Sequence, residues 1–581
     1  MPLFKIKSSK KTKSKEENVQ ALDVALIGCG PAGMMFLHAL NKSRKAGHEN
    51  LPNVTCYERA GAAGGIWRDV PDDDKGRKKP ENTTVMYDDL WSNTPKETME
   101  FYDYTFDDHF KKETPSFLPR KDILEYLLAR NSVDGALDGV KFNHTVQNVQ
   151  YDENSKKFSV AVRDDSTGTE SSGMFDRVIW AAGMHGAAEK PEAMVEVLKD
   201  FTGKVLHSSE CTEDFEQYVN GKNVLLIGDG SSGEDLALRA VKLGAKHVYV
   251  TARSCEGQAS ETASWPSGKV TVIEGPPYKV LKGTHIKCQA VYWYEKKQKY
   301  RKDDEVEAVK VKDVDTVVMS TGYDYPSISI LHDDLQLDSE LTWSVSKGWA
   351  MDNNALTITL GSVKPSENLT PGSTCYSDVY RGVLIDNPNM MYITETYDSA
   401  STFLDLDVNA NLVLAYLTGK VAIPKEKDMI KENQKQLEAE MQVPWLRTSM
   451  DGAYKEEAGE LPENHWSENA SDERAVEMNR MATSLLVRKL ARDMQDAKYP
   501  VDLGNWKKLS PLGEKLVDIN IAAGECRSSI EEENSEWKTF RDMEQKEFAS
   551  LYTGTKSCAL PGHWIQLKAE DGEPTKISTV K

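Results

Sequence analysis

Two glycine-rich segments, each placed directly after a short apolar run, constrain the fold of this chain more than any other feature. The first is Gly28–Gly33 (GCGPAG), which follows Val24–Ile27 (VALI). The second is Gly228–Gly233 (GDGSSG), which follows Val224–Ile227 (VLLI). A short apolar run bounded by glycine predicts a buried parallel strand, and the glycines predict a tight turn into a helix. The sequence therefore predicts an α/β fold with two strand–turn–helix units.

The spacing of the glycines indicates that both units bind a dinucleotide. The first glycine permits the turn, the second lets a pyrophosphate approach the backbone, and the third lets the helix pack close to the strand. The phosphates then lie against the free N–H groups at the positive end of the helix. A chain with two such sites is typical of one that moves hydride between a flavin and a nicotinamide, so FAD and NADPH are the predicted cofactors. The candidate cofactor-binding residues are Gly28, Gly30, Gly33, Gly228, Gly230, Ser231, Ser232 and Gly233.

The residue at the end of the second strand of each unit indicates which nucleotide binds there. Glu58 closes the strand predicted over Asn53–Glu58, where an acid accepts hydrogen bonds from a ribose hydroxyl, as in the AMP half of FAD. Arg253 closes the second unit, Asn223–Arg253, where a cation holds the 2′-phosphate of NADPH and an acid would favour NADH. The alternatives are a solvent-facing Glu58 and a surface Arg253 without a ligand.

The order of the predicted elements places one unit inside the other. We expect two doubly wound, Rossmann-like dinucleotide-binding domains, with the NADPH domain inserted in the FAD domain and a helical C-terminal extension. The expected parts are a disordered Lys-rich tail (1–20), the FAD-binding domain (21–195 and 315–425), the NADPH-binding domain (196–314) and the extension, which packs on the FAD domain (426–581). The supporting patterns are strands over Leu22–Ile27, Arg177–Gly183 and Thr316–Gly322, helices over Pro31–Lys45, Arg120–Asn131, Lys425–Glu440 and Asp472–Ala497, and a small antiparallel sheet over Val140–Val162.

Composition excludes several classes of partner. The net charge of −20 argues against a nucleic-acid-binding surface, which needs clustered Lys and Arg. No stretch approaches the ~18 apolar residues of a membrane span, and the start of the chain has no apolar core typical of a secretory signal. The eight cysteines form no C-x-x-C pair and no metal-ligand spacing, which predicts reduced thiols in a cytoplasmic protein without a metal.

Several further segments carry a resemblance to a known family. Phe201–Ser208 (FTGKVLHS) contains the string F-x-G-x-x-x-H-S, and Met86–Glu97 (MYDDLWSNTPKE) continues into Phe101–Phe110 (FYDYTFDDHF). Shorter matches stand at Glu58-Arg59, Gly64–Trp67, Ser320–Tyr323, Phe540–Asp542 and Tyr552–Thr555. In these motifs, which fall within residues 21–425 and 535–564, the chain resembles the class B flavin-dependent monooxygenases. Within that family it is more similar to the bacterial trimethylamine monooxygenases than to the mammalian enzymes.

The resemblance implies a monooxygenase that uses FAD, NADPH and O2. It would convert small tertiary amines to N-oxides, or S-oxygenate thioethers, through a C4a-hydroperoxyflavin. The candidate catalytic residues are Asn93, implied to hydrogen-bond near the flavin and the retained nicotinamide, and His207, implied to link the two domains rather than to transfer protons. The alternatives are a loop-capping Asn93 and a structural His207. The resemblance also implies a homodimer and cofactor contacts from Gly65, Trp67, Asn93, Thr321, Gly322 and Asn409.

Four positions depart from the family pattern. Ala182 stands in Ala181–Gly183 (AAG), where Ala-Thr-Gly is more usual. Cys211 stands where the family has an aromatic residue, and Baeyer–Villiger enzymes carry Trp there. Ser231 replaces the Tyr or Asn of relatives, and Asn409 replaces a Gln that faces the flavin. Three alternative functions stay open: an NADPH-driven flavin oxidase or reductase, a Baeyer–Villiger monooxygenase, against which Cys211 argues, and a nucleotide-sensing scaffold without activity.

Overall fold

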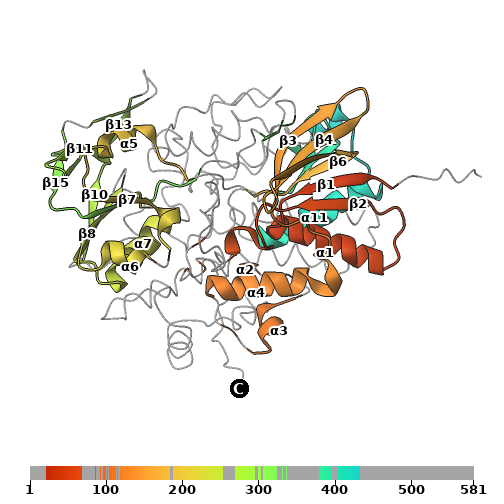
Figure 1. Cartoon of the computed structure of the whole chain (residues 1–581), viewed down its shortest axis with the longest axis horizontal. Helices are drawn as coiled ribbons and strands as arrows, with labels where there is room; N and C mark the ends of the chain where they lie inside the picture. Colours follow the sequence, from red (N-terminus) through yellow and green to blue (C-terminus); the bar gives the residue numbers. More distant parts are fainter. Residues whose placement is uncertain are drawn as a thin grey trace, which may run out of the picture.

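The computed structural model describes one mainly parallel and one entirely parallel sheet, with helices and smaller antiparallel sheets covering them (Figure 1). The described residues are 21–68, 104–112, 118–183, 188–212, 214–229, 231–252, 269–294, 299–302, 305–323, 379–393 and 402–431, together with 86, 90, 92, 96–99, 101, 114, 330, 331 and 335. The predicted tail over 1–20, the helix over Asp472–Ala497 and nearly all of the expected C-terminal extension lie outside them.

The first sheet contains the first glycine-rich turn and has the strand order β17-β18-β19-β6-β1-β2. β19, β6, β1 and β2 run parallel, whereas β17 and β18 form an antiparallel hairpin at one edge. Because both faces of β1 are covered, its residues Val24–Ile27 are apolar without alternation. The strands are β1 (Asp23–Ile27), β2 (Asn53–Tyr57), β6 (Arg177–Trp180), β17 (Val379–Tyr380), β18 (Val383–Leu384) and β19 (Met390–Tyr392).

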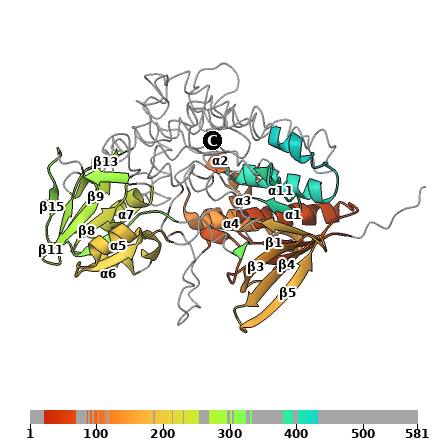
Figure 2. The same ribbon diagram turned by 90° about the horizontal axis from the view of Figure 1, so that it is seen from above.

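Different elements cover the two faces of this sheet. Val24 and Leu26 of β1 pack with residues of three helices, α1 (Pro31–Lys45), α4 (Arg120–Asn131) and α11 (Thr402–Leu417). Ala25 and Ile27 pack with an antiparallel sheet, and Figure 2 shows this sheet and the helices on opposite sides of β1. Its strands are β3 (His144–Asp152), β4 (Lys157–Asp164) and β5 (Thr169–Phe175). The helices predicted over Pro31–Lys45 and Arg120–Asn131 and the small antiparallel sheet are thereby confirmed.

The second sheet contains the second glycine-rich turn and is entirely parallel, in the order β10-β9-β8-β16-β7. On one face Val224 and Leu226 of β8 pack with α6 (Phe215–Val219) and α7 (Ser231–Lys242). On the other face lie α5 (Glu192–Leu198) and a small sheet of β11 (Pro277–Leu281), β12 (His285–Cys288) and β15 (Val309–Val311). The remaining strands are β7 (Lys204–His207), β8 (Asn223–Ile227), β9 (His247–Ala252), β10 (Val270–Glu274) and β16 (Thr316–Met319), and β13 (Val291–Tyr294) pairs with β14 (Lys299–Lys302).

The position of β16 corrects one expected boundary. The sequence predicted that the chain returns to the first domain at residue 315, so that Thr316–Gly322 would belong there. Instead Val318 pairs with Leu226 of β8 and with Leu206 of β7, and all four residues of β16 are buried. β16 is therefore a central strand of the second sheet, and the chain leaves that sheet only after Met319.

Two contacts hold the later part of the chain on the first sheet. Arg130 of α4 and Asp407 of α11 form a buried bidentate ion pair, with both N–O distances 3.0 Å. Met429, in a segment that is helical over 426–431, is buried against Tyr380 and Ile385 beside the β17–β18 hairpin. The beginning of the predicted helix Lys425–Glu440 is thus helical as far as the described residues extend. Among the described helices none has the length and apolar character needed to cross a bilayer.

Candidate functional site

The first glycine-rich turn connects β1 to α1, and Gly28 and Gly33 are the two positions in it that require glycine. Gly28 has a φ of +99°, and a Cβ there would lie 2.5 Å from the carbonyl oxygen of Ala181 at the end of β6. A Cβ at Gly33 would overlap the carbonyl oxygen of Gly28, so α1 packs directly against the turn. The N–H of Gly28 donates to Tyr57 O at 2.9 Å, which ties the turn to the end of β2.

The beginning of α1 has the features of an anion site. No side chain caps the helix at Gly30, and its first turn contains no acidic residue. Only backbone atoms of Gly65, at 3.4 Å and beyond, lie near the place that a Cβ of Gly30 would take. Backbone N–H groups at an uncapped helix N-terminus favour negative charge. The turn therefore fits the pyrophosphate of a dinucleotide.

Glu58 lies at the end of β2 and is held beside this turn by backbone donors. Its Oε2 accepts from the N–H of Cys29 at 2.7 Å, and its Oε1 accepts from the N–H of Ala60 at 2.8 Å. A carboxylate oxygen can accept more than one hydrogen bond, so Glu58 keeps capacity for a ribose hydroxyl. Its position fits the predicted role, which we inferred from its place at the end of the second strand.

The predicted cofactor residues Gly65 and Trp67 lie in η1 (Gly65–Trp67), directly against the first turn. A Cβ at Gly65, where φ is +57°, would stand 3.0 Å from Cα of Gly30. The Trp67 ring packs edge-on against Phe403 of α11, with 5.8 Å between ring centroids. Its carbonyl oxygen accepts a hydrogen bond from Nη1 of Arg120 at 2.5 Å.

The second glycine-rich turn repeats the geometry of the first. Gly228 has a φ of +104° and its N–H donates to Thr251 O of β9 at 3.0 Å, as that of Gly28 does to Tyr57 O. A Cβ at Gly228 would overlap the carbonyl oxygen of Ser320, and one at Gly233 would overlap that of Gly228. The N–H of Ser320 donates to Ile227 O at 2.8 Å, as that of Ala181 donates to Ile27 O at 2.9 Å. The two turns are therefore equivalent sites on two sheets.

One polar atom at the second turn fits a bound ligand. The hydroxyl oxygen of Ser320 is buried and has no hydrogen-bond partner among the described residues. It lies at the second turn, since the Cβ of Ser320 stands 3.8 Å from the place that a Cβ of Gly233 would take. Helix α7 begins at Ser231 and includes Ser232. Gly230 and Arg253 lie outside the described residues, so the 2′-phosphate role of Arg253 stays a prediction.

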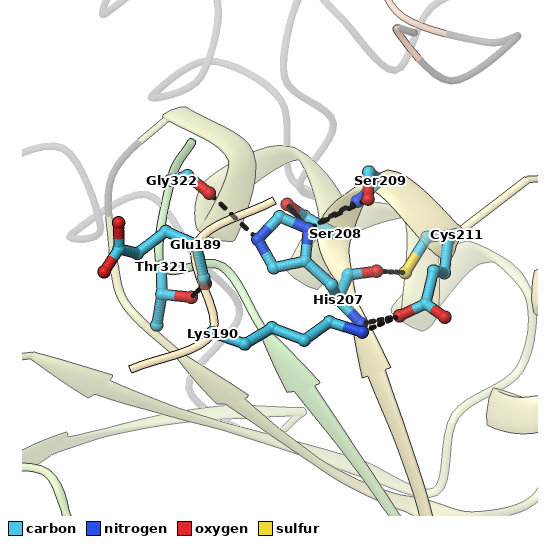
Figure 3. Close-up of polar contacts among 9 residues, drawn as sticks. Glu189, Lys190, His207, Ser208, Ser209, Cys211, Thr321 and Gly322 are labelled. Atoms are coloured by element: carbon cyan, nitrogen blue, oxygen red, sulfur yellow. Dashed lines mark hydrogen bonds and ion pairs between the residues drawn. The ribbon is translucent and has the colours of Figure 1, made fainter. Parts of the chain in front are cut away.

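His207, at the end of β7, is a fully buried and fully bonded side chain (Figure 3). Its Nδ1 accepts from the N–H of Ser209 at 3.1 Å, which leaves the proton on Nε2. Nε2 then donates to Gly322 O at 3.0 Å. Burial lowers the pKa of the imidazole to about 4, so His207 is neutral at physiological pH. These bonds make it a link within the structure and not a proton carrier.

His207 bonds to the place where the chain enters and leaves the second sheet (Figure 3). Residues 188–190 enter it and 321–323 leave it, and Ala188 forms an antiparallel bridge with Tyr323. The N–H of Glu189 donates to Gly322 O at 3.0 Å, and the hydroxyl of Thr321 donates to Glu189 O. Lys190 also forms an ion pair with Glu210 at 3.0 Å. Thr321 and Gly322, predicted as cofactor residues, thus join the two connections, and their cofactor contacts stay a prediction.

Asn409 of α11 lies between the helix and the β18–β19 side of the first sheet. Its Nδ2 donates to Tyr392 O at 3.4 Å, and its Oδ1 would be 2.7 Å from a Cβ at Gly382. Oδ1 is buried and without a hydrogen-bond partner among the described residues. The expected contact with the flavin stays a prediction.

Asn93 lies outside the described residues, but the residues around it reveal groups that the sequence reasoning missed. Two of them are buried cations: Lys96 forms an ion pair with Asp107, and Arg120 donates to the carbonyl of Trp67. The available signal was their position: Lys96 and Asp107 stand inside the motifs Met86–Glu97 and Phe101–Phe110.

Comparisons with known proteins agree with this geometry. Residues 21–287 match the flavin-binding monooxygenase-like family. The chain is 30% identical to trimethylamine monooxygenase of Pelagibacter ubique (strain HTCC1002) over 71% of this chain and 79% of that protein. It is 29% identical to trimethylamine monooxygenase of Roseovarius nubinhibens (strain ATCC BAA-591 / DSM 15170 / ISM) over 70% and 76%, respectively.

Its fold is similar to the crystal structure of Tmm from Pelagibacter sp. strain HTCC7211, with a TM-score of 0.56 and 24% identity over 85% of this chain and 91% of that one. The resemblance inferred from the motifs is thereby confirmed. The chain belongs to the flavin-binding monooxygenase-like family and is a flavin-dependent monooxygenase.

Proposed function

We propose that the protein oxygenates the nitrogen of small tertiary amines, such as trimethylamine, or the sulfur of thioethers, with FAD on the first sheet and NADPH on the second. The observation that carries this proposal is the pair of equivalent glycine turns, each at the carboxyl end of a parallel strand and each backed by a helix N-terminus. Two such sites on one chain suit an enzyme that passes hydride between two nucleotides.

The substrate class follows from the relatives. Two proteins matched over most of their length are named trimethylamine monooxygenase. An amine nitrogen and a thioether sulfur are both nucleophiles that accept an oxygen atom without a protein nucleophile. This chemistry agrees with the composition of the described site, where the buried His207 is already hydrogen-bonded and neutral.

The residues of this chain bind and orient the cofactors. When bound, the nicotinamide nucleotide supplies hydride to the flavin, and the reduced flavin supplies the reactivity toward O2. Glu58 would hold the ribose of FAD, the N-terminus of α1 its pyrophosphate, and Arg253 the 2′-phosphate of NADPH. Asn93 would hydrogen-bond near the reacting ring, where an amide stays neutral and can both donate and accept. His207 keeps the connection between the sheets in place and moves no proton.

The test is product formation by the purified protein. FAD-loaded enzyme is mixed with NADPH, air and a panel of tertiary amines, thioethers and cyclic ketones, and the products are identified by mass. We expect N-oxides or sulfoxides in proportion to the NADPH consumed. Hydrogen peroxide as the only product would instead identify an oxidase, and lactones would identify a Baeyer–Villiger enzyme. A protein that neither retains nor takes up FAD would contradict the proposal entirely.

The cofactor preference has its own test. Removal of the guanidinium in Arg253→Ala should raise KM for NADPH by about tenfold or more and leave KM for NADH nearly unchanged, since only NADPH carries the 2′-phosphate. An equal loss for both nucleotides would remove Arg253 from the site. The cytoplasmic location and the homodimer stay predictions.

A further inference from the structure

Ser92, the residue directly before Asn93 in the sequence, is held by a pair of hydrogen bonds. The N–H of Ser92 donates to Leu118 O at 2.9 Å, and the N–H of Leu118 donates back to Ser92 Oγ at 3.1 Å. The N–H of Arg120 donates to Leu90 O at 2.8 Å, which extends the pairing. Ser92 and Leu118 are both buried, so this attachment is protected from water.

This attachment continues to the first nucleotide site. Arg120, the first residue of α4, is 1% exposed, and its Nη1 donates to the carbonyl of Trp67. Trp67 ends η1, whose Gly65 lies so close to the first glycine turn that a Cβ on it would stand 3.0 Å from Cα of Gly30. Ser92 is therefore connected to the site proposed for FAD. The connection runs from its hydrogen bonds with Leu118, through the bond of Arg120 to Trp67, to η1 beside Gly30.

Lys96, three residues after Asn93 in the sequence, is held by a buried ion pair. Lys96 is the first residue of α2 (Lys96–Met99) and its side chain is 0% exposed. Its ammonium lies 2.9 Å from Oδ1 of Asp107 in α3 (Phe106–Phe110). The same oxygen accepts from the N–H of Thr114 at 2.9 Å and from its hydroxyl at 2.6 Å. One carboxylate oxygen thus gathers three donors from two parts of the chain.

Burial of the Lys96 ammonium carries a large desolvation cost for an interaction that holds one short helix. Removal of a charge from water costs several kcal/mol, and an apolar side chain of similar size often gives the same or greater stability. What the ion pair adds over an apolar contact is direction, because the ammonium must stay within hydrogen-bonding distance of Asp107. Lys96 is therefore better suited to fix a position than to increase stability.

We propose that Lys96 is a positioning residue for oxygen transfer, whose ion pair with Asp107 holds the chain three residues after Asn93, while the Ser92–Leu118 pair holds the residue directly before it. The effect of Lys96 on oxygen transfer rests on the proposed function. Whether Lys96 and Asp107 hold this segment can be measured without turnover.

The test compares Lys96→Met with the matched control Lys157→Met. Lys157 also forms an ion pair with an aspartate, Asp176, at 2.8 Å, but on the partly exposed β4 side of the first sheet. The first readout is hydrogen–deuterium exchange of peptides that cover residues 86–104 in the FAD-loaded protein. We expect about tenfold faster exchange there in Lys96→Met, and unchanged exchange in Lys157→Met.

The second readout is the yield of oxygenated product per NADPH. In Lys96→Met we expect it to fall about fivefold or more, with the difference released as hydrogen peroxide, while flavin content and the rate of flavin reduction by NADPH stay near wild type. Lys96→Arg, which keeps the charge, should recover part of the yield. Lys157→Met should behave as wild type.

The outcomes separate the two proposals. Unchanged exchange at 86–104 in Lys96→Met overturns the positioning role, whatever the enzyme oxygenates. Faster exchange with an unchanged yield also overturns it, because the position would not matter for the reaction. Faster exchange in a protein that oxygenates no substrate refutes the proposed function alone. If Lys96→Met does not fold, Asp107→Asn gives the same readouts, because its side chain is 35% exposed and it keeps an acceptor for Thr114.

Discussion

His207 shows how strongly the surroundings of one residue can set its chemistry. Its ring is buried, its Nδ1 accepts from Ser209 and its Nε2 donates to Gly322. A proton on Nδ1 would break the first of these bonds and place a charge away from water. The sequence left open whether this histidine is catalytic or structural, and these contacts favour a structural link.

The lowered pKa of His207 predicts how stability depends on pH. The folded pKa of about 4 lies below the usual 6.5, so between these values the unfolded chain binds a proton that the folded chain excludes. The stabilisation is complete above pH 6.5 and is lost as the pH falls toward 4. From about pH 7.5 to about pH 5 we expect the wild type to lose about 2 kcal/mol more than His207→Gln. Urea unfolding of both proteins at the two pH values measures this, and equal losses would contradict it.

The buried ion pair of Arg130 and Asp407 predicts a second residue-scale effect. Asp407→Ala leaves a guanidinium without its partner between α4 and α11, which should lower the free energy of unfolding by about 3–5 kcal/mol. The double variant Arg130→Met/Asp407→Leu should recover most of the loss, because it removes the buried charge. In the exposed pair Lys156–Glu153, Glu153→Ala should leave the denaturation midpoint nearly unchanged, because solvent screens the two charges. Denaturant titrations compare the four proteins, and similar losses in both single variants would refute the expectation.

At the scale of elements, the two glycine turns predict that a substitution in each turn impairs the binding of a different nucleotide. Gly28→Ala should reduce FAD retention by about tenfold or more, because the new Cβ meets Ala181 O and φ is +99°. Gly228→Ala should retain FAD but lose reduction by NADPH, while reduction by dithionite stays normal. Gly168→Ala is the control, since its φ is +73° but its Cβ meets nothing within 4 Å. Flavin absorbance of the purified variants measures how much FAD each retains. Loss of FAD in Gly228→Ala, but not in Gly28→Ala, would mean that FAD binds the second sheet and not the first.

Local patterns predicted the elements whose signals are local. The helix over Arg120–Asn131 begins and ends as expected, because apolar residues recur at helical spacing and a proline precedes it. The strands before both glycine turns were equally clear, since a buried parallel strand is uniformly apolar. From these strands followed the α/β fold with two parallel sheets.

What the sequence could not predict depends on pairing between distant segments. The run Thr316–Met319 resembles the central strand of either sheet, and only its register with β7 and β8 assigns it to the second. The buried position of Lys96 was hidden for the same reason, because its partner Asp107 is supplied by another helix. A lysine followed by a glutamate on a short helix is more typical of a solvated surface.

At the scale of the whole molecule, each sheet has its own hydrophobic clusters, and in the described part of the chain the entry to and exit from the second sheet meet at the Ala188–Tyr323 bridge. Figure 1 shows the two sheets apart from each other. Separate cores predict that each nucleotide stabilises its own sheet. FAD at about one hundred times its Kd should add about 2.7 kcal/mol to the protection of amides in β1 and little to those in β8, and NADP⁺ should do the reverse. Hydrogen exchange of the two strands with each nucleotide measures this. Equal protection of both strands by FAD would show that the sheets open as one unit.

The bridge between Ala188 and Tyr323 means that more than a hundred residues of chain make a closed excursion and return to their starting point. The excursion could be excised and its two cut ends rejoined by a short linker without redirecting either end of the remaining chain. A homologous excursion from a relative with different nicotinamide preference could be grafted at the same junction. With NADPH on the second sheet and FAD on the first, as proposed, this junction is the point at which coenzyme choice would be altered without change to the flavin site.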